Sequence, residues 1–104
     1  EDVEAGCEKI QERVKKFREL STFPSSSRGL YRIQVSALKN RKKELKKVME
    51  MALQQKVYIQ CVISILEEVE DANDIQSQTV FQDFISKMNQ DIEFIQSTLD
   101  WIDN

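Results

Sequence analysis

The sequence predicts an all-α protein, an elongated antiparallel three-helix bundle with coiled-coil (heptad) packing and one long central helix. The 104 residues suit a single domain. Only two glycines and one proline are present, too few for the turns of a many-stranded β-fold, and the 40% hydrophobic content is too high for a disordered chain. Apolar residues recur at alternating spacings of three and four, which places them on one side of a helix.

The first helix is predicted over about residues 2–20. Its apolar residues are spaced 4, 3, 4 and 3 apart, and they are Val3, Cys7, Ile10, Val14 and Phe17. The segment STFPSSSRG, residues 21–29, should end this helix, because Pro24 cannot continue a helix and serine side chains bond to nearby backbone. We therefore expect a loop there.

The central helix is predicted over about residues 30–71, a length of about 60 Å at about 1.5 Å per residue. Its periodic positions alternate steps of three and four without a slip: Leu38, Arg41, Leu45, Val48, Ala52, Gln55, Ile59, Val62, Leu66 and Val69. Gln55 interrupts this apolar seam. It either fixes the register with a partner helix or extends its long side chain off the edge of the seam.

The third helix is predicted over about residues 77–103. A turn should precede it within residues 70–79, where Asp, Asn and Ser gather and compete with helix by bonding to backbone. Its apolar residues are again spaced four and three apart, and they are Phe81, Ile85, Met88, Ile92, Ile95, Leu99 and Ile102.

Charge is segregated along the chain: residues 1–12 carry five acids and one lysine, residues 13–56 carry 13 basic and three acidic residues, and residues 57–104 carry ten acids and one lysine. A hairpin loop centred near residue 25 would place the N-terminal glutamates beside the basic segment. The expected pairing joins Glu1, Glu4, Glu8 and Glu12 to the lysines between residues 38 and 49.

The second half of the central helix has apolar residues around much of its circumference, more than one partner helix can cover. A copy of this chain or a helix of another protein would complete the packing. Two aromatic residues lie beside the seam of the third helix, as aromatic anchors of interfaces do. The predicted interface residues are Tyr58, Cys61, Val62, Ile65, Phe94 and Trp101. The alternative is a compact bundle in which the first helix folds over the aromatic flank.

These features favour a non-catalytic protein–protein interaction or scaffolding module that forms a homodimer or captures a partner helix through heptad seams. The alternative is a basic-face module that binds nucleic acid or an anionic membrane. Its basic patch would be Lys39, Arg41, Lys42, Lys43, Lys46 and Lys47. The same residues also suit a salt-bridged surface or a nuclear localisation signal.

The chain has no histidine, which removes imidazole catalysis and imidazole metal ligation. No cluster of residues has metal-ligand spacing, and no glycine-rich loop is present to hold phosphate. We expect no enzyme activity, cofactor, metal or small-molecule substrate. Two cysteines without disulfide spacing indicate a reducing compartment, the cytoplasm or nucleus. Because the chain begins EDVEAG, we expect it to be part of a longer protein.

Overall fold

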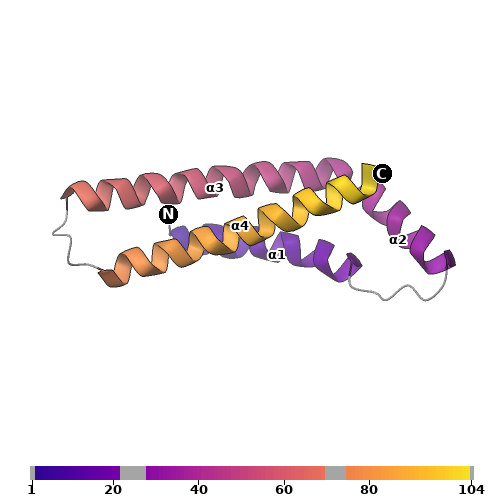
Figure 1. The fold of residues 1–104 in the computed structure, drawn as a ribbon, viewed down its shortest axis with the longest axis horizontal. Helices are drawn as coiled ribbons and strands as arrows, with labels where there is room; N and C mark the ends of the chain where they lie inside the picture. The colour runs from indigo at the N-terminus through magenta and orange to yellow at the C-terminus, as the bar shows by residue number, and fades with distance from the viewer. Residues whose placement is uncertain (1, 22–27, 70–74, 104) are drawn as a thin grey trace.

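The computed structural model describes residues 2–21, 28–69 and 75–103, and every element within these ranges is an α-helix (Figure 1). The helices are α1 (Val3–Ser21), α2 (Arg28–Asn40), α3 (Lys42–Val69) and α4 (Ile75–Asp103). The molecule is elongated, with extents of 58 × 23 × 22 Å. The predicted all-α class is confirmed, but the described chain has four helices where the sequence predicted three.

The long helices α3 and α4 run antiparallel and side by side, so the end of α4 lies next to the start of α3 (Figure 1). Lys42 and Asp103 form an ion pair at this end. The apolar stripes of the two helices face each other and supply most of the core, namely Leu45, Val48, Ala52, Ile59, Ile63, Met88, Ile95, Leu99 and Ile102. The helix predicted over about 77–103 therefore corresponds to α4.

Helix α1 lies against both α3 and α4. Its predicted apolar stripe is buried at all five positions, Val3, Cys7, Ile10, Val14 and Phe17. Asp2 caps the helix, because its carboxylate accepts a hydrogen bond from the backbone N–H of Glu4 at 3.1 Å. The 4–3 spacing thus identified both the helix and its buried face.

The prediction of one continuous helix over 30–71 is wrong, because the helix breaks at Arg41. The backbone N–H of Arg41 donates to the carbonyl of Leu38 at 3.1 Å, a tightened turn, while its guanidinium donates to the carbonyl of Ala37, also at 3.1 Å. The side chain thereby satisfies the acceptor that the α-helical N–H would have used. The regular ladder resumes when Leu45 N–H donates to the Arg41 carbonyl at 2.9 Å.

The break turns α2 away from the line of α3, so that α2 contacts α1, α3 and α4 at one end of the molecule (Figure 1). The side-chain amide of Gln34 donates to the carbonyl of Leu20 and joins α2 to the end of α1. Of the two predicted connections, residues 22–27 and 70–74 lie outside the described residues. Arg28 and Gly29 belong to α2, and residues 75–79 belong to α4.

The predicted pairing of α1 with the basic segment is also wrong. The Gln55 amide donates to the Val3 carbonyl at 3.2 Å, and the Arg13 guanidinium donates to the sulfur of Met51 at 3.5 Å. Thus α1 lies beside the middle of α3, about ten residues beyond the expected level. Among the described residues, no ion pair joins Glu4, Glu8 or Glu12 to the basic segment. The expectation assumed one straight helix, and the bend at Arg41 shifts the pairing along α3.

The orientation of α3 is testable with two leucines. Leu45 is fully buried, whereas Leu53, about 80° around the helix from Leu45, is 42% exposed. Leu45→Ala should lower the free energy of unfolding by about 2–5 kcal/mol, because a cavity remains in the core. Leu53→Ala should cost less than about 1 kcal/mol. Urea denaturation at low micromolar protein concentration measures both, and equal costs would contradict the observed orientation.

Candidate functional site

The side of α3 that faces away from the core carries an apolar strip. We define this strip as Leu53, Val57, Tyr58, Cys61 and Ile65. Leu53, Val57, Tyr58 and Ile65 are between 42% and 59% exposed, and the Cys61 thiol is also exposed. Four of the residues follow each other at intervals of four, which forms a ridge about 18 Å long, and Tyr58 lies beside it.

The strip lies on the opposite side of α3 from the core. Ala52, Ile59 and Ile63 are buried against α1 and α4, and at 100° per residue they lie roughly half a turn from Cys61. Figure 1 shows α3 along one edge of the molecule, with α1 and α4 on its other side. This half of α3 is therefore apolar on both sides, and the described chain covers one of them.

The structure groups three of the predicted interface residues, Tyr58, Cys61 and Ile65, on the strip. Val62 is half-buried at its margin. Sequence reasoning missed Leu53 and Val57, although their positions eight and four residues before Cys61 were a usable signal. The missing information was which side of α3 the other helices occupy.

Charged residues flank the strip along α3. Lys43, Lys46 and Lys47 are exposed toward its N-terminal end, whereas Glu67 and Glu68 are exposed toward its C-terminal end. At 100° per residue, the three lysines and Glu68 fall within about 60° of Cys61, so they share the outer face of α3 with the strip. Glu50 is also exposed on this face, about 20° from Cys61. The outer face is therefore net basic before the strip and acidic after it.

The predicted basic patch does not form one uniform face. Lys39 belongs to α2, Arg41 lies at the helix break and bonds to backbone, and Lys42 pairs with Asp103. The hydrogen bond from Lys42 holds the pKa of Asp103 below its ordinary value. Only the lysines on the outer face of α3 remain aligned with one another.

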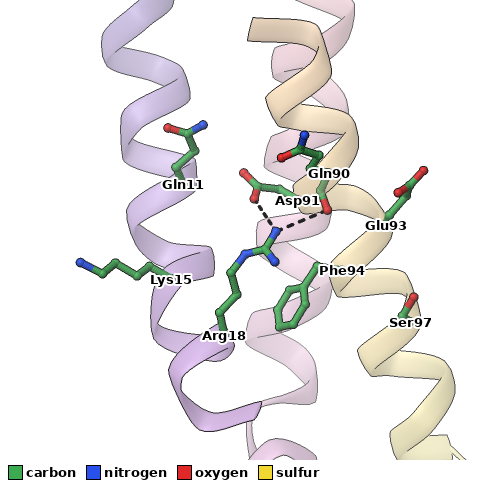
Figure 2. Close-up of a pocket in the computed structure, with 8 residues that line it drawn as sticks. All are labelled: Gln11, Lys15, Arg18, Gln90, Asp91, Glu93, Phe94 and Ser97. Atoms are coloured by element: carbon green, nitrogen blue, oxygen red, sulfur yellow. Dashed lines mark hydrogen bonds and ion pairs between the residues drawn. The ribbon is translucent and has the colours of Figure 1, made fainter. Parts of the chain in front are cut away.

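Phe94 and Trp101 are separate from the strip, because they belong to α4. The Arg18 guanidinium of α1 lies 4.4 Å from the centre of the half-buried Phe94 ring, a cation–π contact (Figure 2). Helix α1 therefore contacts Phe94, as expected if the first helix folds over the aromatic flank. Trp101 is 39% exposed.

The same arginine bonds to a buried acid that sequence reasoning missed. Arg18 donates to Asp91 Oδ1 at 3.1 Å and to the carbonyl of Gln90 at 3.5 Å (Figure 2). Asp91 is only 6% exposed, and its Oδ2 atom is buried without a hydrogen-bond partner. Burial raises the pKa of Asp91, and the hydrogen bond and charge of Arg18 oppose this rise. The spacing from Met88 and Ile95, three and four residues, was the signal that placed Asp91 on the buried stripe.

Gln55 fixes the position of α1 on α3. Its amide donates to the Val3 carbonyl and also contacts the Cys7 sulfur at 3.7 Å. Gly6 allows this approach, because a Cβ atom at Gly6 would lie only 2.7 Å from the Gln55 amide nitrogen. The geometry favours the register-fixing interpretation of Gln55 over the alternative of a side chain directed off the seam.

Within the described residues, no group of three or more Cys, Asp or Glu side chains is arranged to hold a metal ion. In that same part of the chain, no helix combines the length and apolar character needed to cross a membrane. Comparison of the chain with protein-family models, with curated proteins and with solved structures gives no significant match. The site must therefore be interpreted from its own geometry.

The two cysteines should differ strongly in reactivity. Cys61 is exposed, whereas Cys7 is 1% exposed and burial raises the pKa of its thiol. Because the thiolate is the reactive form, a disulfide reagent should modify one thiol per folded monomeric chain quickly, at low protein concentration, and the second only on unfolding. Cys61→Ser should abolish the fast reaction. Fast modification of both thiols in the folded chain would contradict the burial of Cys7.

Asp91 should make stability depend on pH in a defined direction. Its pKa is raised in the folded state. Between the pKa of the unfolded chain and that of the folded chain, Asp91 is therefore protonated in the folded chain and ionised in the unfolded chain. Its contribution to the free energy of unfolding should therefore fall as pH rises above about 4. Asp91→Asn removes this titration, so the stability of wild type relative to the variant should decrease from pH 4 upward. Denaturation at several pH values measures this difference, and an increase with pH would contradict the assignment.

Proposed function

We propose that this chain is a non-catalytic protein–protein interaction module that binds an amphipathic helix along the outer face of α3. The observation that supports it is the apolar strip on the side of α3 opposite the core. A scaffolding or oligomerising role follows from such a surface, because contiguous exposed apolar residues rimmed by charge mark interaction sites. The proposed interface is thus limited to the outer face of α3, whereas the sequence prediction also included Phe94 and Trp101 of α4.

The strip suits a helix as its occupant. Helix-binding surfaces use apolar anchors spaced three and four residues apart, and the strip offers anchors at intervals of four along about 18 Å. Ridges at this spacing interdigitate with the side chains of a second helix. We accordingly propose coiled-coil packing for this contact. The aromatic ring of Tyr58 adds area and a hydroxyl at its margin.

Two further parts of the proposal rest on composition. The absence of histidine from the sequence, and of a metal-ligand cluster from the part of the chain that the structure describes, supports a role without catalysis and without a cofactor. The cysteine spacing supports a reducing compartment, the cytoplasm or nucleus. Neither part depends on the identity of the bound helix.

The basic-face function is the second candidate. One observation favours it: the glutamates expected to neutralise the lysines lie elsewhere, and Lys43, Lys46 and Lys47 remain exposed together. It is weaker than helix binding, because three aligned lysines are few and no aromatic residue lies among them for stacking on bases.

Helix binding is testable with a fluorescein-labelled synthetic peptide, an idealised amphipathic helix with leucines spaced three and four apart. Titration with the chain should raise its fluorescence anisotropy to saturation. Ile65→Lys should weaken binding at least tenfold, about 1.4 kcal/mol, because it places a charge in the contact. Helix content should stay unchanged, since the buried Ile59 and Ile63 are untouched.

Gln60→Lys is the matched control, because it adds the same charge at an exposed position on α3 outside the strip. It should bind as the wild type does. Absence of saturable peptide binding, or equal loss in both variants, would contradict the proposal. Tight binding of the wild type to duplex DNA or anionic vesicles at physiological salt, in place of the peptide, would support the basic-face function.

A further inference from the structure

We propose that the helix bound by the strip is α3 of a second copy of this chain, in antiparallel orientation. This inference rests on the proposed function and specifies its partner. The order of charges along the outer face of α3 and the shape of the molecule at the two ends of that face support this arrangement.

The outer face is complementary to itself only when one copy is reversed. Lys43, Lys46 and Lys47 precede the strip, and Glu67 and Glu68 follow it. Two antiparallel copies place the basic end of each opposite the acidic end of the other. Two parallel copies place lysines against lysines, which is unfavourable.

The apolar residues define the alignment. The strip extends from Leu53 to Ile65, so a two-fold axis near Ile59 superimposes the strip of one copy on that of the other. Lys47 then lies within about one helical turn of Glu68 in the second copy. Glu50 also approaches Glu68 in this alignment, but Lys46 and Lys47, one turn away on the same helix, offset that repulsion.

The shape of the molecule leaves room for this arrangement. A straight continuation of α3 into α2 would extend the outer face beyond Lys42, but the break at Arg41 turns α2 toward α1 and α4 (Figure 1). The helices that cover the core lie on the other side of α3. A contact between two such faces is isologous, so it closes as a dimer and does not propagate.

The test compares charge-reversed chains by sedimentation equilibrium at low salt. Lys46→Glu/Lys47→Glu and Glu67→Lys/Glu68→Lys should each weaken homodimerisation about tenfold, because like charges then meet at both ends. An equimolar mixture of the two variants should dimerise as tightly as wild type, because opposite charges meet again at both ends. A parallel dimer would not be weakened by either variant alone.

Cross-linking reports the orientation directly. In a Cys61→Ser background, Gln54→Cys and Ser64→Cys chains are treated with a short bismaleimide, separately and mixed. Residues 54 and 64 are equidistant from Ile59, so the mixture should cross-link between the two variants far more than either variant cross-links with itself. Efficient cross-linking of each variant with itself would overturn the antiparallel arrangement.

A chain that remains monomeric at high micromolar concentration would also overturn this inference. Saturable binding of the amphipathic peptide to that monomer would then show that the strip binds a helix of another protein. Loss of both self-association and peptide binding would remove the proposed function as well. The two proposals therefore fail in distinguishable ways.

Discussion

The antiparallel contact between α3 and α4 is the interaction on which the rest of the structure depends. It supplies most of the buried apolar side chains, and hydrophobic burial is the dominant stabilising term for a chain of this size. It also determines which side of α3 faces the core. Since α3 is apolar on two sides, burying one of them exposes the other, and the candidate interaction surface is a direct consequence.

Polar contacts decide where the shorter helices lie on this pair. Gln55 bonds to the backbone of α1 next to Gly6, while Arg18 connects α1 to Asp91 and Phe94 of α4. Apolar stripes can slide along one another at small cost, whereas a buried amide or carboxylate finds its partner at one position only. Fixing the position of α1 through Asp91 costs free energy, because the Oδ2 atom of Asp91 is buried without a hydrogen-bond partner.

The break at Arg41 connects the fold to the surface. It allows α2 to return to α1 and α4, and it ends the straight part of the outer face at Lys42. Because α1 lies beside the middle of α3, the lysines of that face do not lie opposite the N-terminal glutamates. They are exposed and could pair with acidic side chains of another molecule. In the proposed homodimer, the acidic end of a second copy is the complement of these lysines, so the position of α1 along α3 would influence the association of two chains.

The sequence by itself determined the helical class, the buried stripe of α1, the burial of four of the seven predicted stripe residues of α4, and the excess of apolar surface around residues 57–66. These properties depend on spacing within one helix, which the 3.6-residue period reveals directly. It also pointed to Tyr58, Cys61 and Ile65. Leu53 and Val57 lay within reach of the same spacing argument once the covered side of α3 was known.

The tertiary structure alone decided the break at Arg41, the level at which α1 meets α3, the burial of Asp91 and the separation of Phe94 from the strip. No glycine or proline lies at the break to reveal it in the sequence. The break is accommodated by the Arg41 side chain, which donates a hydrogen bond to the carbonyl of Ala37. Register and burial depend on contacts between residues 38 to 73 positions apart, such as Arg13 with Met51 and Arg18 with Asp91. A periodic pattern fixes the angle of a residue around its own helix but not its height beside another, and that height decides which charges meet.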